Sequence, residues 1–489
     1  MRFKYLFNVI ALIAITTNSF AQYANDAVRF STFQPGSTSR IKAIGNASTA
    51  IGGDLSSVAG NPAGLGFFTR SELSLTPEFD ASGVNANYLG QSSHAAKSSA
   101  NLNNIAIVFY SRLNTPPGTD KSKGWLSLNF GMGYNRTNDF GRSINYNAKN
   151  NNSSISDYYA GLANTDGKTD GTLQSWAYDQ NLIDLYGTTN PTYKSNAFPG
   201  VTQANSITRS GGQSEFDLSL GANYSNRLYF GFSVGIPNLR YTSVNNFTET
   251  GIASVIENGI AVNRNFNSTY SQTQDTKGDG FNAKFGVIYK LLENVRVGAL
   301  ISSPTYITVN DSYNEALSSS FSNGNKYSNG PTNYPLTYNM RTPFKAAGGL
   351  SIFFNQYGFI TGDVEYVDYS ATYISSNDNY DNTYDNGIIK NNYQAAINAH
   401  AGTEIKITSG IALRGGYGIQ GSALKTNGSS TKTASAGLGF RFGSYYIDAA
   451  YVHINGQQTV TPYTIGALTP SANLDASNNN VFVTFGFRY

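Results

Sequence analysis

Apolar and polar residues alternate along several segments of the chain, so that every second residue faces the same side. In the final segment, apolar residues stand at every second position from Val481 to Tyr489, while Gly486 and Arg488 lie on the opposite face. The same period occurs around Phe440 and Phe285. A period of two is typical of β-strands with one apolar and one polar face. The pattern predicts an all-β protein, and both a soluble sandwich and a membrane barrel produce it.

The lengths of the connections separate these two architectures. Turns of a few residues near Ser225, Leu292 and Ser444 alternate with long polar stretches, the longest of which spans residues 141–213. Short turns at one end and long loops at the other are typical of up-and-down barrels in an outer membrane. We therefore predict a 14-stranded antiparallel transmembrane β-barrel over residues 71–489, with 141–213 as a long extracellular loop.

The predicted strands are even in number, which places both ends of the barrel on the periplasmic side. Their ranges are 71–79, 101–113, 124–140, 214–226, 227–248, 277–291, 293–312, 334–354, 357–375, 392–408, 410–424, 430–444, 445–464 and 479–489.

The first residues of the chain have the composition of a secretory signal peptide. Arg2 and Lys4 precede an apolar run, and small residues precede the cleavage site that we predict after Ala21, which makes 1–21 the signal peptide. No later stretch approaches the roughly 18 apolar residues that a transmembrane helix needs. We expect a multi-pass β-barrel in the outer membrane of a Gram-negative cell.

Composition agrees with this class. Mean hydropathy is only −0.31, yet aromatic residues make up 13% of the chain, as alternating strands with aromatic girdles require. A net charge of +3 is too small to indicate a nucleic-acid partner. The chain contains no cysteine, which excludes a disulfide framework and thiol chemistry.

Residues 22–70 fit no strand pattern and are rich in glycine, alanine and serine. Asp54 is placed to cap a short helix that Gly60 ends, and a turn follows at Asn61 and Pro62. A compact segment before the first strand of a large barrel predicts an N-terminal hatch that plugs the lumen. A periplasmic extension is the alternative.

The hatch motif Asn61-Pro62-Ala63-Gly64 carries a resemblance to a known family. Together with Ala43-Ile44-Gly45-Asn46-Ala47, it resembles the hatch of the FadL/TodX family of outer-membrane transporters, most of all its Bacteroidetes-like branch. The stretches Ser303-Pro304-Thr305 and Arg341-Thr342-Pro343 resemble strand motifs of that family. The resemblance spans the whole mature chain and implies passive uptake of long-chain fatty acids or hydrocarbons.

The resemblance also implies a lateral exit, where the third strand kinks inward beside the hatch. Gly131 and Gly133 lie in the third predicted strand and are our candidates for this lateral gate, because glycine permits a bulge or kink. The alternative is that both glycines only leave room for the plug.

Two motifs of enzymes occur by chance. Gly231-Phe232-Ser233-Val234-Gly235 matches the nucleophile elbow, but it lies in mid-strand, whereas that chemistry needs a strand-to-helix turn. The pattern Gly-x-Gly-x-x-Gly over residues 416–421 also lies in a strand with no helix after it. We expect no enzymatic activity, no catalytic residue and no cofactor.

Metal and haem sites are also not expected. His94, in the first predicted outer loop, His400, facing inward, and His453, facing lipid, are far apart in sequence and lack ligand spacing. Asp378, Asp381 and Asp385 could bind calcium in an outer loop, but their spacing does not follow an EF-hand, which favours a solvated loop.

Charged residues are predicted on the inner face of the barrel. A structural network that holds wall and plug together is one role for them, and contact with a ligand carboxylate is another. The principal lumen charges are Arg296, Arg341, Glu404, Arg414, Arg441 and Arg488.

The preferred function is passive uptake of small hydrophobic molecules through the lumen and a lateral gate. The expected partners are outer-membrane lipid, a small hydrophobic ligand and the barrel assembly machinery, and we expect a monomer. The alternative is a FadL-like carrier barrel of a protein secretion or assembly system. A haemin receptor and a barrel enzyme acting on lipids are further alternatives, and the sequence identifies no ligand-binding residue.

Overall fold

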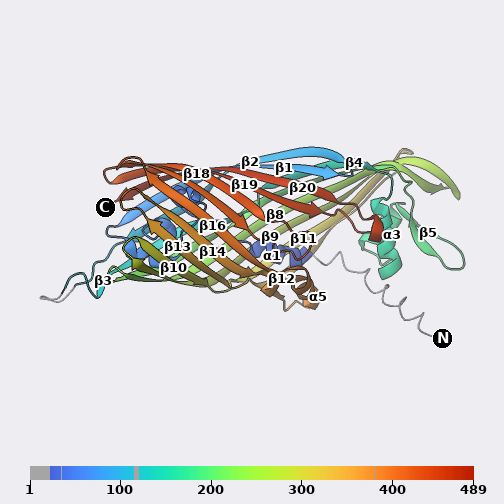
Figure 1. The fold of residues 1–489 in the computed structure, drawn as a ribbon. Coiled ribbons are helices and arrows are strands. Elements are labelled where there is room, and N and C mark those ends of the chain that lie inside the picture. The colour runs from blue at the N-terminus through green and yellow to red at the C-terminus, as the bar shows by residue number, and fades with distance from the viewer. Residues whose placement is uncertain (1–21, 35, 115–119, 379) are drawn as a thin grey trace, which may run out of the picture.

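The computed structural model describes residues 22–34, 36–114, 120–378 and 380–489. The predicted signal peptide, residues 1–21, lies outside the described residues. The described chain forms an elongated antiparallel barrel with short helices inside it and further helices at one end (Figure 1). Among the described residues, no helix has the length and apolar character needed to cross a membrane.

The wall strands follow one another around the barrel, and the last pairs with the first along almost its whole length. They are β1 Glu72–Tyr88, β2 Gln91–Phe109, β3 Trp125–Asp139, β4 Arg142–Asn150, β7 Val201–Tyr224, β8 Leu228–Glu257, β9 Ile260–Leu292, β10 Val295–Ser302, β11 Tyr306–Phe321, β12 Lys326–Arg341, β13 Lys345–Phe353, β14 Gly358–Asp368, β15 Tyr373–Ser375, β16 Ala395–Lys406, β17 Ile411–Gln420, β18 Thr431–Phe442, β19 Tyr445–Val460 and β20 Ala472–Arg488.

The remaining elements are short. They are α1 Gln22–Ser31, α2 Ser39–Ala43, η2 Leu55–Val58, η3 Pro62–Phe67, α3 Ile155–Asp166, α4 Leu173–Asp179, β5 Ile183–Tyr186, β6 Thr192–Ser195, η4 Tyr369–Ala371, α5 Thr383–Asn392 and η5 Gly466–Leu468.

Fourteen strands close the wall, because four of them are each interrupted once. β3 continues as β4, β10 as β11, β12 as β13 and β14 as β15. The predicted 14-stranded antiparallel barrel with an N-terminal plug is therefore confirmed. We call the end of the barrel that carries Tyr489 and the short turns the turn end, and the opposite end the loop end (Figure 1).

Several strands extend further toward the loop end than predicted. β1 and β2 form one hairpin that turns at Leu89 and Gly90, so His94 lies in β2 and not in a loop. β4 and the first part of β7 likewise occupy much of the predicted loop 141–213, which shortens the true connection to 151–200. In the extensions of β1 and β4 the apolar side chains, such as Tyr88 and Tyr146, face inward and polar ones such as Asn145 face outward. This is the reverse of the apolar-outward alternation that revealed the other strands.

Arg341, one of the predicted lumen charges, faces outward and not into the lumen. Arg341 is exposed and lies over the ring of Tyr373, whereas its neighbour Met340 is buried inside the barrel. The interruption at Thr342 and Pro343 changes which alternate residues face inward, because proline cannot donate to the strand ladder. The alternation that places Lys345 inside therefore cannot be continued back to Arg341.

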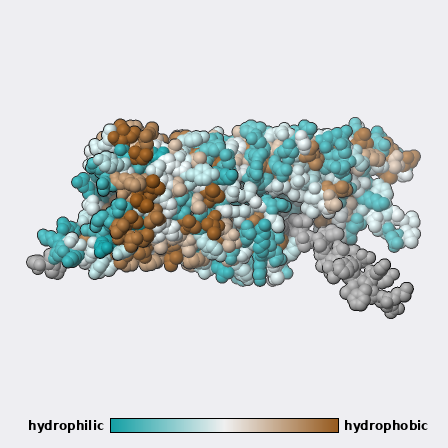
Figure 2. Space-filling view, viewed as in Figure 1, coloured by the Kyte–Doolittle hydropathy of each residue, from teal (hydrophilic) through white to brown (hydrophobic). Residues whose placement is uncertain are grey.

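An apolar belt surrounds the barrel near its turn end. Figure 2 shows hydrophobic residues gathered at this end, whereas the middle of the visible face is mostly hydrophilic. The belt consists of side chains that are more than one third exposed, such as Leu73, Ile105, Leu218, Phe232, Phe285, Leu350, Leu413, Leu438 and Phe485. Aromatic side chains border it at the turn end, among them Trp125, Tyr224, Tyr357, Tyr445 and Tyr489.

The loop end is closed by packing. Val84 and Tyr88 of β1 meet Ile144 and Tyr146 of β4 across the inside of the barrel in one buried cluster. Beyond this cluster, α3 and α4 pack on the extensions of β8, β9 and β11 around Trp176. No wide opening therefore runs straight through this end of the described structure.

The plug lies inside the barrel at two levels. α1 fills the middle of the lumen, where Phe30 packs on Phe140 and Tyr241. The backbone amide of Ala24 in α1 donates to Asp385 of α5 at 3.0 Å, and burial raises the pKa of this carboxyl group. The rest of the plug, from α2 to η3, fills the turn end.

Glycines of the wall give the lower plug its space. A Cβ on Gly416 would overlap the backbone of Ile44 and Gly45, and a Cβ on Gly231 would overlap that of Pro62 and Ala63. Equivalent close contacts with the plug occur at Gly221, Gly286, Gly298, Gly402 and Gly437. The plug backbone thus rests directly on the inner wall at positions where any side chain would collide with it.

Gly416→Ala should therefore destabilise the docked plug, whereas Gly415→Ala should not, because no atom lies within 4 Å of a Cβ on this neighbouring glycine. Overpacking of a tight contact costs about 1–3 kcal/mol. Unfolding of the purified barrel by urea, together with protease cleavage of the plug, measures both variants. Equal stability of the two variants would contradict the role assigned to Gly416.

Candidate functional site

The wall is incompletely paired between β2 and β3. β2 pairs with β1 along its length, but with β3 only from Asn104 to Phe109. The last pair joins Asn104 to Asn135, and β3 then bulges between Arg136 and Asn138. Beyond this point the edges of β2 and β3 are not joined by backbone hydrogen bonds in the described structure. We call this gap the slit.

A strip of the plug, residues 32–34 and 36–37, lies in the slit. The Gln34 amide donates to the Thr137 carbonyl at 2.8 Å, and the Asn138 side chain donates to the Thr32 carbonyl at 3.0 Å. On the other edge, the Asn103 side chain donates to the Ser37 carbonyl. The strip therefore bonds to both edges of the slit in place of a wall strand.

Gly36 brings the strip close to both strands at once. A Cβ at this position would lie 2.7 Å from the Arg136 carbonyl oxygen and 2.9 Å from that of Asn103. Only glycine fits between two backbones at such distances. Nearer the loop end, the Asn101 side chain bridges the edges directly and donates to Asp139 at 2.9 Å.

The predicted gate glycines lie beside the slit and not in it. Gly131 pairs with Val108 on one side and with Ser219 on the other, and Gly133 pairs with Ala106 and Asp217. A Cβ on Gly131 would lie 2.9 Å from a methyl group of Val58 in the plug. Pairing is thus regular at both glycines, and the bulge follows them in the chain.

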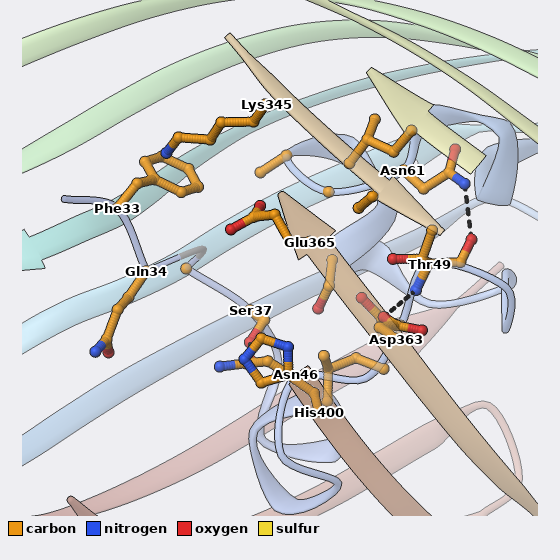
Figure 3. A pocket seen from close by; sticks show the side chains of 18 of the residues that line it. Phe33, Gln34, Ser37, Asn46, Thr49, Asn61, Lys345, Asp363, Glu365 and His400 are labelled. Carbon is orange, nitrogen blue, oxygen red and sulfur yellow. Dashed lines mark hydrogen bonds between the residues drawn. The ribbon is translucent and has the colours of Figure 1, made fainter. Parts of the chain in front are cut away.

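A cavity of about 160 Å³ lies between plug and wall, directly behind the strip. Figure 3 shows the strip residues Phe33, Gln34 and Ser37 along one side of this cavity and Glu365, Lys345 and His400 of the wall strands around it. The strip therefore has the cavity on one side and the edges of the slit on the other.

The cavity is lined by both polar and aromatic groups. The ammonium group of Lys345 lies 4.5 Å from the centroid of the Phe33 ring. The Oδ2 atom of Asp363 accepts a hydrogen bond from the Thr49 amide of the plug at 2.8 Å (Figure 3). The wall strands are interrupted at Ser303 and Thr342, and both residues also line this space.

The slit begins at the border of the apolar belt. Ile105, which pairs with Tyr134 next to the last pair of the β2–β3 ladder, and Leu102, beside the strip, are both 38% exposed on the outer surface. The slit, which the strip fills, thus lies between the inner cavity and the outer surface at the height where apolar side chains begin.

Five of the six principal lumen charges face inward and hold the structure together. Glu404 binds Arg40 of the plug at 2.8 Å and Arg414 of the wall at 2.7 Å, and Arg414 also binds Asp448 at 2.7 Å. The other three contact neighbouring groups: Arg441 binds Asp448, Arg488 binds Glu72, and Arg296 donates to the Ile51 carbonyl and stacks between Phe67 and Phe353.

The hatch motif Asn61-Pro62-Ala63-Gly64 has a clear local structure. Asn61 caps the short helix η3 by accepting from the Ala63 amide, and its side chain donates to the Thr49 carbonyl at 2.7 Å. Pro62 occupies the first position of the helix, where its missing N–H is not needed. The motif thus folds the plug back toward the wall glycines.

The enzyme-like motifs prove to be plug contacts. Ser233 is buried under the plug and bonds to the Ser219 hydroxyl at 2.7 Å. Gly231 and Gly416 of these motifs are the glycines that make room for the plug backbone. In the part of the chain that the structure describes, no group of three or more His, Cys, Asp or Glu side chains is placed to hold a metal.

Sequence reasoning missed the residues that border the slit. Asn101 and Asn103 of β2 and Asn138 of β3 form side-chain hydrogen bonds at the slit, and Asn135 accepts one from Asn104 at its lower end. Four asparagines on two consecutive strands are the signal that could have indicated side-chain bonding in place of backbone pairing.

Known structures share this fold. A FadL homologue from Pseudomonas aeruginosa aligns with 93% of this chain and 99% of its own, at 13% identity and a TM-score of 0.55. The toluene transporter TodX of Pseudomonas putida aligns over the same shares at 13% identity and a TM-score of 0.52. The chain therefore has the fold of FadL-type barrels. No protein-family model and no curated protein sequence matches it.

Glu404→Gln should destabilise the plugged barrel by about 3 kcal/mol or more, because it removes the charge that two buried arginines share. Asp275→Asn is the matched control, since its ion pair with Lys277 is exposed and is worth about 0.5 kcal/mol. Urea unfolding of both purified variants measures the difference. A loss in the Glu404 variant no larger than in the control would contradict the structural role of this cluster.

Proposed function

We propose that this protein is an outer-membrane channel for passive uptake of small hydrophobic molecules, which leave its lumen sideways through the slit between β2 and β3. The observation that carries the proposal is the strip: a few residues of the plug are all that separates the inner cavity from the unpaired edges of the wall. Displacing the strip requires breaking a few hydrogen bonds, whereas opening any other seam requires breaking a full strand ladder.

The apolar belt supports the membrane setting. A closed barrel satisfies every backbone group internally, which is the condition for crossing a bilayer with strands. The belt with its aromatic border has the character of a lipid-facing surface. A solute that leaves at the belt would enter the bilayer without crossing water at the turn end.

The fold supports the substrate class. Known barrels of this fold include a toluene transporter, and a hydrophobic solute gains most from an exit into lipid. The mixed lining of the cavity, with Phe33 beside Lys345, favours molecules that pass with a small polar group in addition to their apolar part.

A staple across the slit tests the exit. Asn101→Cys/Asp139→Cys places the two thiols of a cysteine-free chain on opposite edges, where a short reducible bis-thiosulfonate linker should join them. We expect the linker to abolish uptake of a fluorescent dodecanoic acid and of toluene by Gram-negative cells, and reduction to restore it. The linker holds the edges together, so the strip cannot leave.

The control staple joins two strands elsewhere. Ser351→Cys/Thr361→Cys lies in the regular wall between β13 and β14, where the native hydroxyls are 2.8 Å apart. This linked variant should take up both probes at the parental rate. Undiminished uptake through the stapled slit, in a well-folded barrel, would rule out the lateral exit at β2 and β3.

A further inference from the structure

A second cavity, of about 170 Å³, lies closer to the loop end. Arg142 of β4 lines one side of it, and Thr431, Gln458 and Asn478 of the opposite strands line another. Ile454 borders both this cavity and the one behind the strip, so the two are neighbours inside the barrel.

Arg142, which lines this cavity, stands directly opposite a second arginine of the wall. Arg142 and Arg209 are cross-strand partners in the β4–β7 pair. Both face inward, because they alternate in step with the buried residues Ile144 and Ile207. Like charges directly opposite on one face of a sheet destabilise it, so this pair requires an explanation.

Within the part of the chain that the structure describes, neither guanidinium group has an ion-pair or hydrogen-bond partner. The Nε atom of Arg209 is buried and unpaired. The nearest carboxylates are already engaged: Asp139 binds Arg136 at 2.7 Å, and Asp26 binds Arg29.

A third cation adds to the excess. The ammonium group of Lys97 in β2 donates to the backbone carbonyl of Arg209 at 2.6 Å. Three cationic residues thus lie on neighbouring strands, and the two nearby carboxylates are each bound to a different arginine. Such an excess inside a barrel is balanced most directly by a bound anion.

We propose that Arg142 and Arg209, supported by Lys97, form a binding site for a phosphoryl group, either free or at the head of an amphiphile. Two planar guanidinium forks match the oxygens of a tetrahedral phosphoryl group. A group with close to two negative charges balances the excess better than a carboxylate with one. Thr431 and Asn478 across the cavity supply neutral hydrogen-bonding groups. The site does not depend on the lateral exit, because it concerns binding alone.

The test uses purified protein in a neutral maltoside detergent and calorimetric titration with four probes. Dodecyl phosphate and inorganic phosphate distinguish an amphiphile head from a free anion. Dodecanoate tests the preference for phosphoryl over carboxylate, and dodecanol tests the need for charge. The variants are Arg142→Gln, Arg209→Gln and Arg142→Lys, and the matched control is Arg240→Gln, whose side chain is exposed on the outer face of β8.

We expect at least one phosphoryl probe to bind, and each glutamine variant to weaken it about tenfold or more. Arg142→Lys should give an intermediate loss, because it keeps the charge but not the fork. Tighter binding of dodecyl phosphate than of inorganic phosphate identifies an amphiphile head, and equal binding identifies a free phosphate.

Unfolding by urea without ligand distinguishes a ligand site from a pair of arginines that only stabilises the barrel. In the absence of ligand, Arg142→Gln and Arg209→Gln should unfold at equal or higher urea than the parent, because each removes repulsion. Lower stability of both variants with unchanged phosphate binding would overturn the proposal. Dodecanoate or dodecanol binding as tightly as dodecyl phosphate would overturn the phosphoryl preference, as would binding of none of the probes.

Discussion

The contact between the plug backbone and the glycines of the wall determines the rest of this structure. At Gly231, Gly298, Gly402 and Gly416, any side chain on the wall would occupy the space of the plug backbone. Contact this close removes water from the interface, so every polar group there needs a protein partner. The cluster of Arg40, Glu404 and Arg414 supplies such partners, and the serine and asparagine side chains around the plug supply others.

In the proposed lateral exit the strip is the part that moves, because the lower plug is tightly fixed. From α2 to η3 the plug is fixed by backbone packing and buried ion pairs, and α1 above it is anchored by Phe30 and by Asp385 of α5. Between these two anchored parts, the strip makes hydrogen bonds to the slit edges and borders a cavity on its other side. The proposed lateral exit depends on this division, in which most of the plug stays in place while one short segment moves.

Under the proposed function, hydrophobic solutes would pass through a lumen that is itself largely polar. Charged residues line both cavities, and the apolar clusters lie where the barrel is closed. Polar walls let a small solute pass without binding so tightly that it stays. The paired arginines beside the second cavity are the exception, because they concentrate one sign of charge at one place.

The sequence by itself determined the architecture: the two-residue period, the alternation of short and long connections and the glycine-rich N-terminus suffice for a plugged 14-stranded barrel. These features are local, because apolar side chains must face outward at every second position of each strand. The tertiary structure alone decided where the regular pairing of neighbouring wall strands ends. The pairing of β2 with β3 ends at Asn104 on the side of the loop end. Arg341 faces outward at the break before Lys345. Arg142 lies opposite Arg209 in the β4–β7 pair. Each outcome depends on which strand lies opposite and in which register, and the alternation of residues within a single strand does not specify that choice.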